Sequence, residues 1–126
     1  MSSTFKTSNS FFHSPKHAIR GIFQIIKNER NFRIQIVVAV LVVAFGFFLE
    51  ISHNDWIAVA FLISLVLISE AFNSVIEAVC DTISKEYRVN IKYAKDVSAG
   101  AVFVSAILSV ILGLIIFFPY VLELFL

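Results

Sequence analysis

Charged residues are scarce in this 126-residue chain: Asp, Glu, Lys and Arg make up 15% of it, and the formal net charge is +1. Soluble domains carry about 25% charged residues, and nucleic-acid-binding proteins carry a basic excess. The composition therefore argues against a soluble domain and against a nucleic-acid partner. Glycine, proline and cysteine are also rare, with four, two and one residues. Their scarcity suits long helices, and the lone Cys80 leaves no internal disulfide.

Apolar residues, by contrast, are abundant. The hydrophobic fraction is 59% and the mean hydropathy is +0.89. A water-soluble fold of this size could not bury so much apolar surface, so lipid must cover part of it. We therefore expect an all-α integral membrane protein, with residues 1–126 forming a single domain. Residues 1–13 lack the apolar core of a signal peptide and are expected to form a flexible lead.

Four helices are expected from the residue pattern. Ser14-Pro15 provides a capping side chain followed by a proline at the first helical position. Beyond it, apolar and basic residues alternate at helical spacing, which predicts a basic amphipathic helix at 14–28, suited to an anionic membrane surface or to packing on its own protein. The apolar runs predict three membrane-spanning helices, at 32–49, 56–80 and 97–122.

Basic residues are distributed unevenly among the segments between these helices. All ten Lys and Arg residues lie at positions 6–33 or 85–95, and the polar turn at 50–55 has none. Segments rich in Lys and Arg stay in the cytoplasm. The N-terminus and residues 82–96 are therefore expected in the cytoplasm, and the turn and the C-terminus outside.

Polar residues interrupt the second expected membrane helix within the stretch SEAFNSVIEAVCD. On a helix they fall within a sector of about 80°; they are Glu70, Asn73, Glu77 and Asp81. Glu70 lies 14 residues after Trp56, a rise of roughly 21 Å, which leaves it inside a hydrocarbon core of about 30 Å. An intramembrane carboxylate is costly and usually functional. The pattern predicts one polar stripe that runs from within the bilayer to its cytoplasmic surface.

Further polar residues are expected at the same surface, namely Glu29, Lys95 and Asp96. Carboxylate and amide oxygens suit Mg²⁺, a lysine suits a phosphate, and a carboxylate held in a drier place suits a general base. The residues thus describe a place where a phosphorylated soluble molecule meets a lipid headgroup. The absence of any glycine-rich phosphate motif means that other groups would hold a nucleotide.

Three other interpretations of the stripe remain open. In the first, the polar groups are hydrogen-bonded contacts between helices. In the second, the chain is a non-catalytic membrane scaffold. In the third, it is a small oligomeric ion or proton transporter with Glu70 as its intramembrane site. A transporter would need polar residues in both halves of the membrane, and the outer half offers little beyond Ser64. This one-sidedness favours an enzyme that acts at the interface.

Four segments carry a resemblance to a known family: NERNFR (28–33), EAFNSVIEAVCD (70–81), EY (86–87) and AKDVSAGAV (94–102). With them the chain, from about Phe11 to Val121, resembles the small bacterial integral-membrane diacylglycerol kinases and undecaprenol kinases. The resemblance implies a homotrimer of three-span subunits in the bacterial inner membrane. It implies transfer of the γ-phosphoryl group of ATP to a lipid hydroxyl with Mg²⁺, in active sites shared between neighbouring subunits.

The resemblance also implies roles for individual residues. Glu70 would be the general base, and Glu29 and Glu77 would bind Mg²⁺. The nucleotide site would use His17, Asn73, Glu77, Tyr87, Lys95 and Asp96. Arg33 and Asp81 are further candidate site residues.

The chain departs from the family pattern at three positions. His17 stands where relatives usually have Tyr, and Arg88 where His is usual. Gln35 occupies a position that is acidic in some diacylglycerol kinases and a histidine in undecaprenol kinases. NERNFR, the SAGAV run and the Phe118-Pro119 ending favour the undecaprenol-kinase branch, although the lipid acceptor stays open between undecaprenol and diacylglycerol.

Overall fold

The described part of the chain, residues 14–84 and 88–126 of a computed structural model, is built from helices. They are α1 (Ser14–Asn28), α2 (Arg30–Phe48), α3 (His53–Ile83) and α4 (Val89–Phe125). Each of α2, α3 and α4 is long and apolar enough to cross a membrane. The expected architecture of three membrane helices after a short N-terminal helix is therefore confirmed. The flexible lead expected at 1–13 and the Tyr87 side chain lie outside the described residues.

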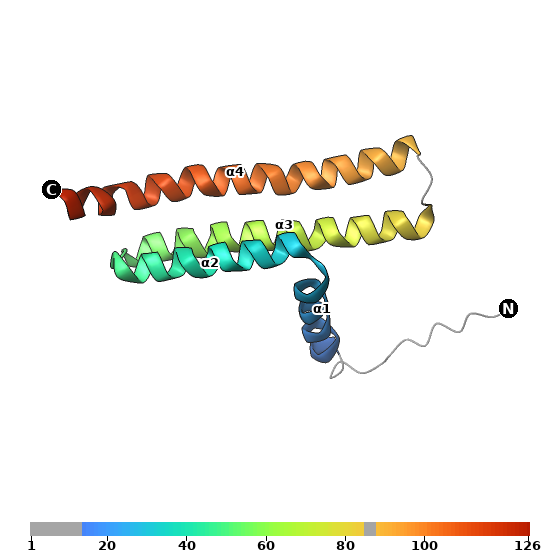
Figure 1. Cartoon of the computed structure of the whole chain (residues 1–126), viewed down its shortest axis with the longest axis horizontal. Helices are drawn as coiled ribbons and strands as arrows, with labels where there is room; N and C mark the ends of the chain where they lie inside the picture. Colours follow the sequence, from blue (N-terminus) through green and yellow to red (C-terminus); the bar gives the residue numbers. More distant parts are fainter. Residues whose placement is uncertain (1–13, 85–87) are drawn as a thin grey trace.

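The three long helices lie side by side along one axis, and α1 leaves this bundle at a steep angle from the start of α2 (Figure 1). Along the chain, α3 packs against both α2 and α4. Side chains of α3 can therefore meet partners on both neighbouring helices. This central position is what gives its polar residues their surroundings.

The corner between α1 and α2 is formed by a single residue with an extended backbone, Glu29 (φ −109°, ψ 108°). Arg33 stabilises the corner, because its guanidinium donates hydrogen bonds to the carbonyl oxygens of Ile26 and Lys27 at 2.9 and 2.8 Å. The last carbonyls of a helix lack partners within that helix. Arg33 supplies them for α1 and so holds the direction in which α1 leaves the bundle.

The amphipathic character of α1 is visible in the exposure of its side chains. Its apolar residues Ile19, Ile22 and Phe23 are all exposed, and none of its residues is buried. Ile25 and Ile26, nearer the corner, are half-buried, so the rest of the described chain covers only part of the apolar face. Such a face suits a helix that lies at a membrane surface.

The turn between α2 and α3 is joined to the far end of α4. The Ser52 hydroxyl caps α3 by accepting a hydrogen bond of 3.2 Å from the Asp55 N–H. The Tyr120 hydroxyl accepts from the Ser52 N–H at 2.9 Å and donates to the Asp55 carboxylate. Gly46 lets α2 approach α3 closely here, since a Cβ atom on it would lie 2.7 Å from the Trp56 ring. These contacts fix the end of the bundle that lies opposite α1.

Two helices are longer than the membrane segments expected from the sequence. Helix α3 covers residues 53–83 where 56–80 was expected, and α4 covers 89–125 where 97–122 was expected. The expected ranges followed the apolar length that fits hydrocarbon. A helix continues beyond that length wherever its backbone hydrogen bonds can form, so α4 begins within the polar segment 82–96.

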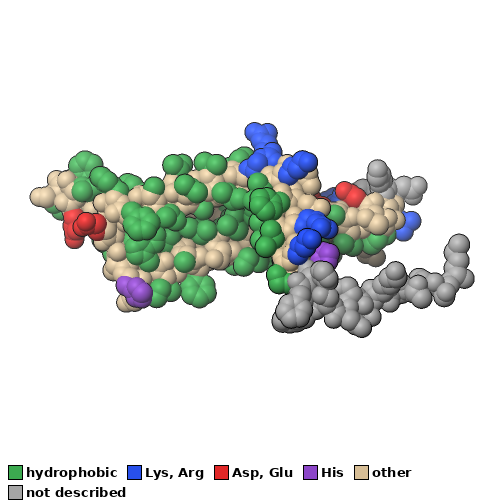
Figure 2. All heavy atoms as spheres, turned by 90° about the horizontal axis from the view of Figure 1, so that it is seen from below, with side chains coloured by type: hydrophobic (Ala, Val, Ile, Leu, Met, Phe, Trp, Pro, Cys, Tyr) green, Lys and Arg blue, Asp and Glu red, His purple; other side chains and the backbone are tan. Residues whose placement is uncertain are grey.

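Polar residues are as frequent as apolar ones among the buried side chains of the described residues. The buried apolar residues are Phe32, Ile51, Val59 and Cys80, and the buried polar ones are Glu70, Asn73, Ser98 and Ser105. Most large apolar side chains are exposed, and they cover the length of the bundle in Figure 2. Basic side chains gather at the end that carries α1 (Figure 2). The surface is apolar where a soluble protein would be polar, which suits contact with lipid.

Candidate functional site

The polar stripe of α3 passes from a buried region to an exposed one. Glu70 and Asn73 are buried, with 3% and 9% of their surface exposed. Glu77 is half-buried and Asp81 is exposed. Glu70 and Asp81 are eleven residues apart, which is about 16 Å along the helix. The stripe therefore leads from a water-poor position to solvent.

The buried end of the stripe is held by hydrogen bonds to both neighbouring helices. Gln35 on α2 donates from Nε2 to Oε2 of Glu70 at 3.3 Å. Ser98 on α4 donates from Oγ to Oδ1 of Asn73 at 2.7 Å. Each bond joins side chains far apart in the sequence. Together they fix the orientation of the carboxylate and of the amide.

Glu29 lies close to the stripe although it belongs to the corner between α1 and α2. Its Oε1 accepts a hydrogen bond of 2.9 Å from the hydroxyl of Ser74, one residue after Asn73 on α3. The negative charges of Glu29 and Glu77 both act on Glu70. Glu70 therefore lies within electrostatic range of two other carboxylates, one from the corner before α2 and one from α3.

A groove of 760 Å³ opens between α1 and α3 beside this cluster. Its walls are largely apolar, and its acidic residues are Glu29, Glu77 and Asp81. Glu70 and Asn73 do not line it, because they face the contacts with α2 and α4. The predicted stripe is thus divided between an open acidic groove and a buried pair behind it.

The cationic residues at the exposed end are paired with acids. Lys95 Nζ donates to Asp81 Oδ1 at 2.6 Å, and the charge of Glu77 also acts on Lys95. Lys92 pairs with Asp96 one turn along α4. The structure therefore brings Lys95 to the exposed end of the stripe and turns Asp96 toward its own helix. Neither Lys95 nor Asp96 lines the groove.

The other predicted site residues are His17, Tyr87 and Arg33. His17 is exposed on α1 and is not part of the groove lining. Tyr87 lies outside the described residues. Arg33 contacts backbone carbonyls at the end of α1, so its contacts within the chain hold the corner beside the groove.

The acidic groove can be tested as a magnesium site. Within residues 14–84 and 88–126 no three His, Cys, Asp or Glu side chains are grouped closely enough to hold a metal ion by themselves. Mg²⁺, however, is commonly held by one or two carboxylates, with waters and substrate phosphates completing its six ligands. Glu29 and Glu77 supply two carboxylates beside one groove. The donor set therefore fits a metal that arrives with a nucleotide.

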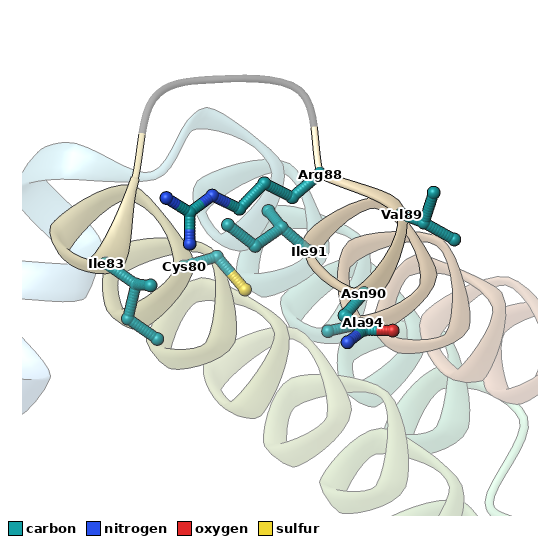
Figure 3. A pocket seen from close by; sticks show the side chains of 7 residues that line it. All are labelled: Cys80, Ile83, Arg88, Val89, Asn90, Ile91 and Ala94. Atoms are coloured by element: carbon teal, nitrogen blue, oxygen red, sulfur yellow. The ribbon is translucent and has the colours of Figure 1, made fainter.

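A second pocket lies where α3 ends and α4 begins. Its volume is 420 Å³, and in Figure 3 the Arg88 side chain reaches across it toward Cys80. Cys80 is buried, as free cysteines commonly are. The pocket is lined mainly by apolar side chains from both helix ends, such as Ile83, Val89 and Ile91. In the sequence, Arg88 is notable only as a departure from the family pattern.

Three residues near the site carry contacts that the sequence analysis did not assign: Gln35, Ser74 and Ser98. All three are polar side chains within or beside apolar helices, which is the only signal that the sequence offers. Serine is common between membrane helices, so that signal alone does not select Ser74 or Ser98. Their partners became apparent only from the packing of α3 between α2 and α4.

Known proteins similar to this chain identify its family. The family model for prokaryotic diacylglycerol kinase matches residues 16–117. Undecaprenol kinase of Bacillus subtilis (strain 168) is 40% identical over 111 residues, which cover 88% of this chain and 90% of the relative. The diacylglycerol kinase of Synechocystis sp. is 36% identical over 113 residues (86% and 63% covered), and that of Haemophilus influenzae is 31% identical over 107 residues (84% and 91% covered). These matches confirm the predicted resemblance: the chain belongs to the prokaryotic diacylglycerol kinase family and is a lipid kinase.

Proposed function

We propose that this kinase transfers the γ-phosphoryl group of ATP to the hydroxyl of a membrane lipid alcohol at the cytoplasmic surface of the bacterial inner membrane. The observation that carries the proposal is the course of the α3 stripe, from buried Glu70 to exposed Asp81. A lipid alcohol can reach the buried end from the bilayer, and a soluble nucleotide can reach the exposed end from water. The stripe is where the two substrates can meet.

The orientation follows from the distribution of charge. The end of the bundle that carries α1 is basic (Figure 2), and the turn at 50–55 has no Lys or Arg. Basic ends of membrane proteins remain in the cytoplasm. The exposed end of the stripe lies at this basic end, so it faces the compartment that contains ATP.

Glu70 is the proposed general base. In the reaction, the O–H bond of the lipid alcohol breaks, its proton passes to Glu70, and its oxygen bonds to the γ-phosphorus. The bond from the γ-phosphorus to the bridging oxygen breaks, and ADP leaves. Positioning of the two substrates supplies most of the acceleration in such transfers.

The remaining site residues hold the nucleotide in this proposal. Asn73, whose amide oxygen accepts from Ser98, would offer its NH₂ group to the phosphates, and Lys95 would supply positive charge to them. Glu29 and Glu77 would hold Mg²⁺, which when bound would neutralise phosphate charge. His17, Tyr87 and Asp96 are proposed to contact the nucleotide from the edges.

Undecaprenol is the proposed acceptor, with diacylglycerol as the alternative. The relative named undecaprenol kinase is 40% identical to this chain, and the two reported relatives named diacylglycerol kinase are 36% and 31% identical. The NERNFR and SAGAV segments favour the same branch. Both acceptors present a single hydroxyl at the end of a long apolar body.

A homotrimer is also proposed. The described chain buries few side chains and leaves apolar faces on all three long helices. Neighbouring subunits would cover part of these faces and complete the nucleotide site. Glu29 and Glu77 could then come from different subunits as well as from one.

The test is phosphorylation by the purified protein in mixed detergent and lipid micelles with Mg-ATP. Undecaprenol and diacylglycerol are supplied separately, and labelled lipid phosphate is measured. We expect both to be phosphorylated faster than a no-lipid control, and undecaprenol faster than diacylglycerol. If neither lipid were phosphorylated and the protein in liposomes carried a Glu70-dependent proton flux, the transporter would be the correct function instead.

A further inference from the structure

Gln35 on α2 makes one hydrogen bond to Glu70 and leaves its other amide end unpaired. The Nε2 atom donates to Glu70 Oε2 at 3.3 Å. The Oε1 atom is buried and has no hydrogen-bond partner among the residues that the structure describes. Buried polar atoms nearly always have a partner, so an unpaired one calls for a specific explanation.

Glu70 lies near two other acidic residues, and its hydrogen-bond partner, Gln35, is uncharged. The charges of Glu29, at the start of α2, and of Glu77, on α3, both act on Glu70. The ion pairs of the described chain join other residues, Lys92 to Asp96 and Lys95 to Asp81. No cation is thus paired with Glu70 in this part of the chain, and the Gln35 amide is the side chain that it contacts by a hydrogen bond.

An amide differs from a cation in what it can offer to a carboxyl group. An ionised carboxylate only accepts hydrogen bonds, whereas a protonated one also donates. A lysine or arginine can donate to a carboxyl group but cannot accept a hydrogen bond from its protonated form, since it has no acceptor. A glutamine carries a donor and an acceptor on one planar group, and a half-turn about its Cγ–Cδ bond exchanges their positions.

We propose that Gln35 positions Glu70 in both protonation states, using Nε2–H toward the carboxylate and Oε1 toward the acid. The inference rests on the proposed function of Glu70 as the base. When the proton of the lipid alcohol passes to Glu70, the N–H···O⁻ bond from Gln35 is replaced by an O–H···O=C bond from Glu70 to Gln35. Gln35 neither gains nor loses a proton, and it touches the base rather than the reacting atoms. The unpaired Oε1 is the acceptor that the second state requires.

The experiment compares two Gln35 variants with a matched control in the full-length protein. Gln35→Met removes both donor and acceptor at similar length. Gln35→His keeps one donor and one acceptor on a neutral ring. Asn31→Leu is the control, because it removes an exposed amide from the same helix, one turn earlier. For each protein, kcat, the KM values for ATP and lipid, and the solvent deuterium isotope effect on kcat are measured in mixed micelles.

The expected results separate positioning from packing. Gln35→Met should lower kcat about 10- to 100-fold, the size of loss that a misplaced catalytic group produces. Its KM for ATP should stay unchanged, and its solvent isotope effect should rise because proton transfer becomes slower. Gln35→His should recover most of the lost kcat, and Asn31→Leu should behave as the unmodified chain does.

The other possible results distinguish a failure of the proposed function from a failure of the role inferred for Gln35. An unmodified protein that phosphorylates no lipid contradicts the proposed function itself. An active unmodified protein whose Gln35→Met variant matches Asn31→Leu contradicts the inference alone. If circular dichroism shows that Gln35→Met does not fold, Gln35→His decides the matter: a folded Gln35→His protein without activity overturns the inference.

Discussion

The hydroxyl of Ser98 on α4 donates a hydrogen bond of 2.7 Å to the amide oxygen of Asn73 on α3, and both side chains are buried. The bond fixes which end of the amide faces α4. The NH₂ group of Asn73 is then the end that remains for a ligand. A phosphate oxygen is an acceptor, so this orientation suits the proposed contact with the nucleotide.

Loss of this bond should weaken nucleotide binding rather than catalysis of the bound complex. In Ser98→Ala, Asn73 can turn its amide, and a hydrogen bond worth about 1 kcal/mol is lost, which corresponds to a rise of roughly fivefold in the KM for ATP. Steady-state kinetics at saturating lipid measure this change. Ser105→Ala is the control, because Ser105 is equally buried but bonds to the Val102 carbonyl of its own helix. An equal effect of both substitutions would show that only the packing of α4 is involved.

Replacement of the proposed base should abolish transfer and spare the fold. In Glu70→Gln the substituted amide can still accept the hydrogen bond from Gln35, so the contact between α2 and α3 is retained. Lipid phosphorylation should fall by roughly 10²- to 10⁴-fold, the usual contribution of a general base. The affinity for Mg-ATP, measured by calorimetry, should change little.

Glu123→Gln is the matched control for the base. It removes a carboxylate from the exposed end of α4, near the C-terminus. Its turnover should equal that of the unmodified protein. Normal turnover in Glu70→Gln as well would remove Glu70 from the role of base.

The sequence allowed the α3 stripe and the membrane helices to be predicted because both depend on local patterns. The spacing of Glu70, Asn73 and Glu77 sets their common face on any helix, and apolar length sets the ability to span a bilayer. The sequence pattern could not predict which residues of the stripe line the groove and which face α2 or α4. That division depends on how α3 is rotated against α2 and α4, and this rotation follows from side-chain packing along the whole interface.

The start of α4 illustrates a second limit. Residues 82–96 are polar, and polarity predicts contact with water without deciding between loop and helix. The structure continues the helix to Val89, so Lys92 and Asp96 face each other one turn apart. Asp96 therefore pairs with Lys92, a contact that was not expected for a residue at the nucleotide.

We expect Arg33 to stabilise the corner between α1 and α2 through its hydrogen bonds, and not only to contribute a positive charge. Arg33→Met removes two hydrogen bonds to the last carbonyls of α1. We expect a loss of about 1 kcal/mol in the free energy of unfolding, together with a raised KM for Mg-ATP, because α1 forms one wall of the acidic groove. Thermal unfolding and kinetics measure the two effects.

Arg30→Met provides the control for Arg33, since it removes an equal charge from an exposed position on the same helix. Arg30→Met and Arg33→Met carry the same net charge and lose it from the same end of α2, so any effect of charge on membrane orientation should be equal in the two variants. Similar stability and KM values in the two variants would contradict the role of Arg33 at the corner.

Substitutions of Lys95 and Asp81 can show whether Lys95 serves only in a structural ion pair or also contacts the nucleotide. Exposed ion pairs contribute little to stability, so Lys95→Met should unfold at nearly the temperature of the unmodified protein. Its KM for ATP should nevertheless rise about tenfold, because a charged hydrogen bond to phosphate is lost. The double variant Lys95→Asp/Asp81→Lys restores the pair with reversed direction. We expect it to fold normally and to keep the raised KM, since position 95 on α4 then carries an acid in place of the lysine that is proposed to contact phosphate. Recovery of ATP affinity in the double variant would mean that the pair serves only to join α3 to α4.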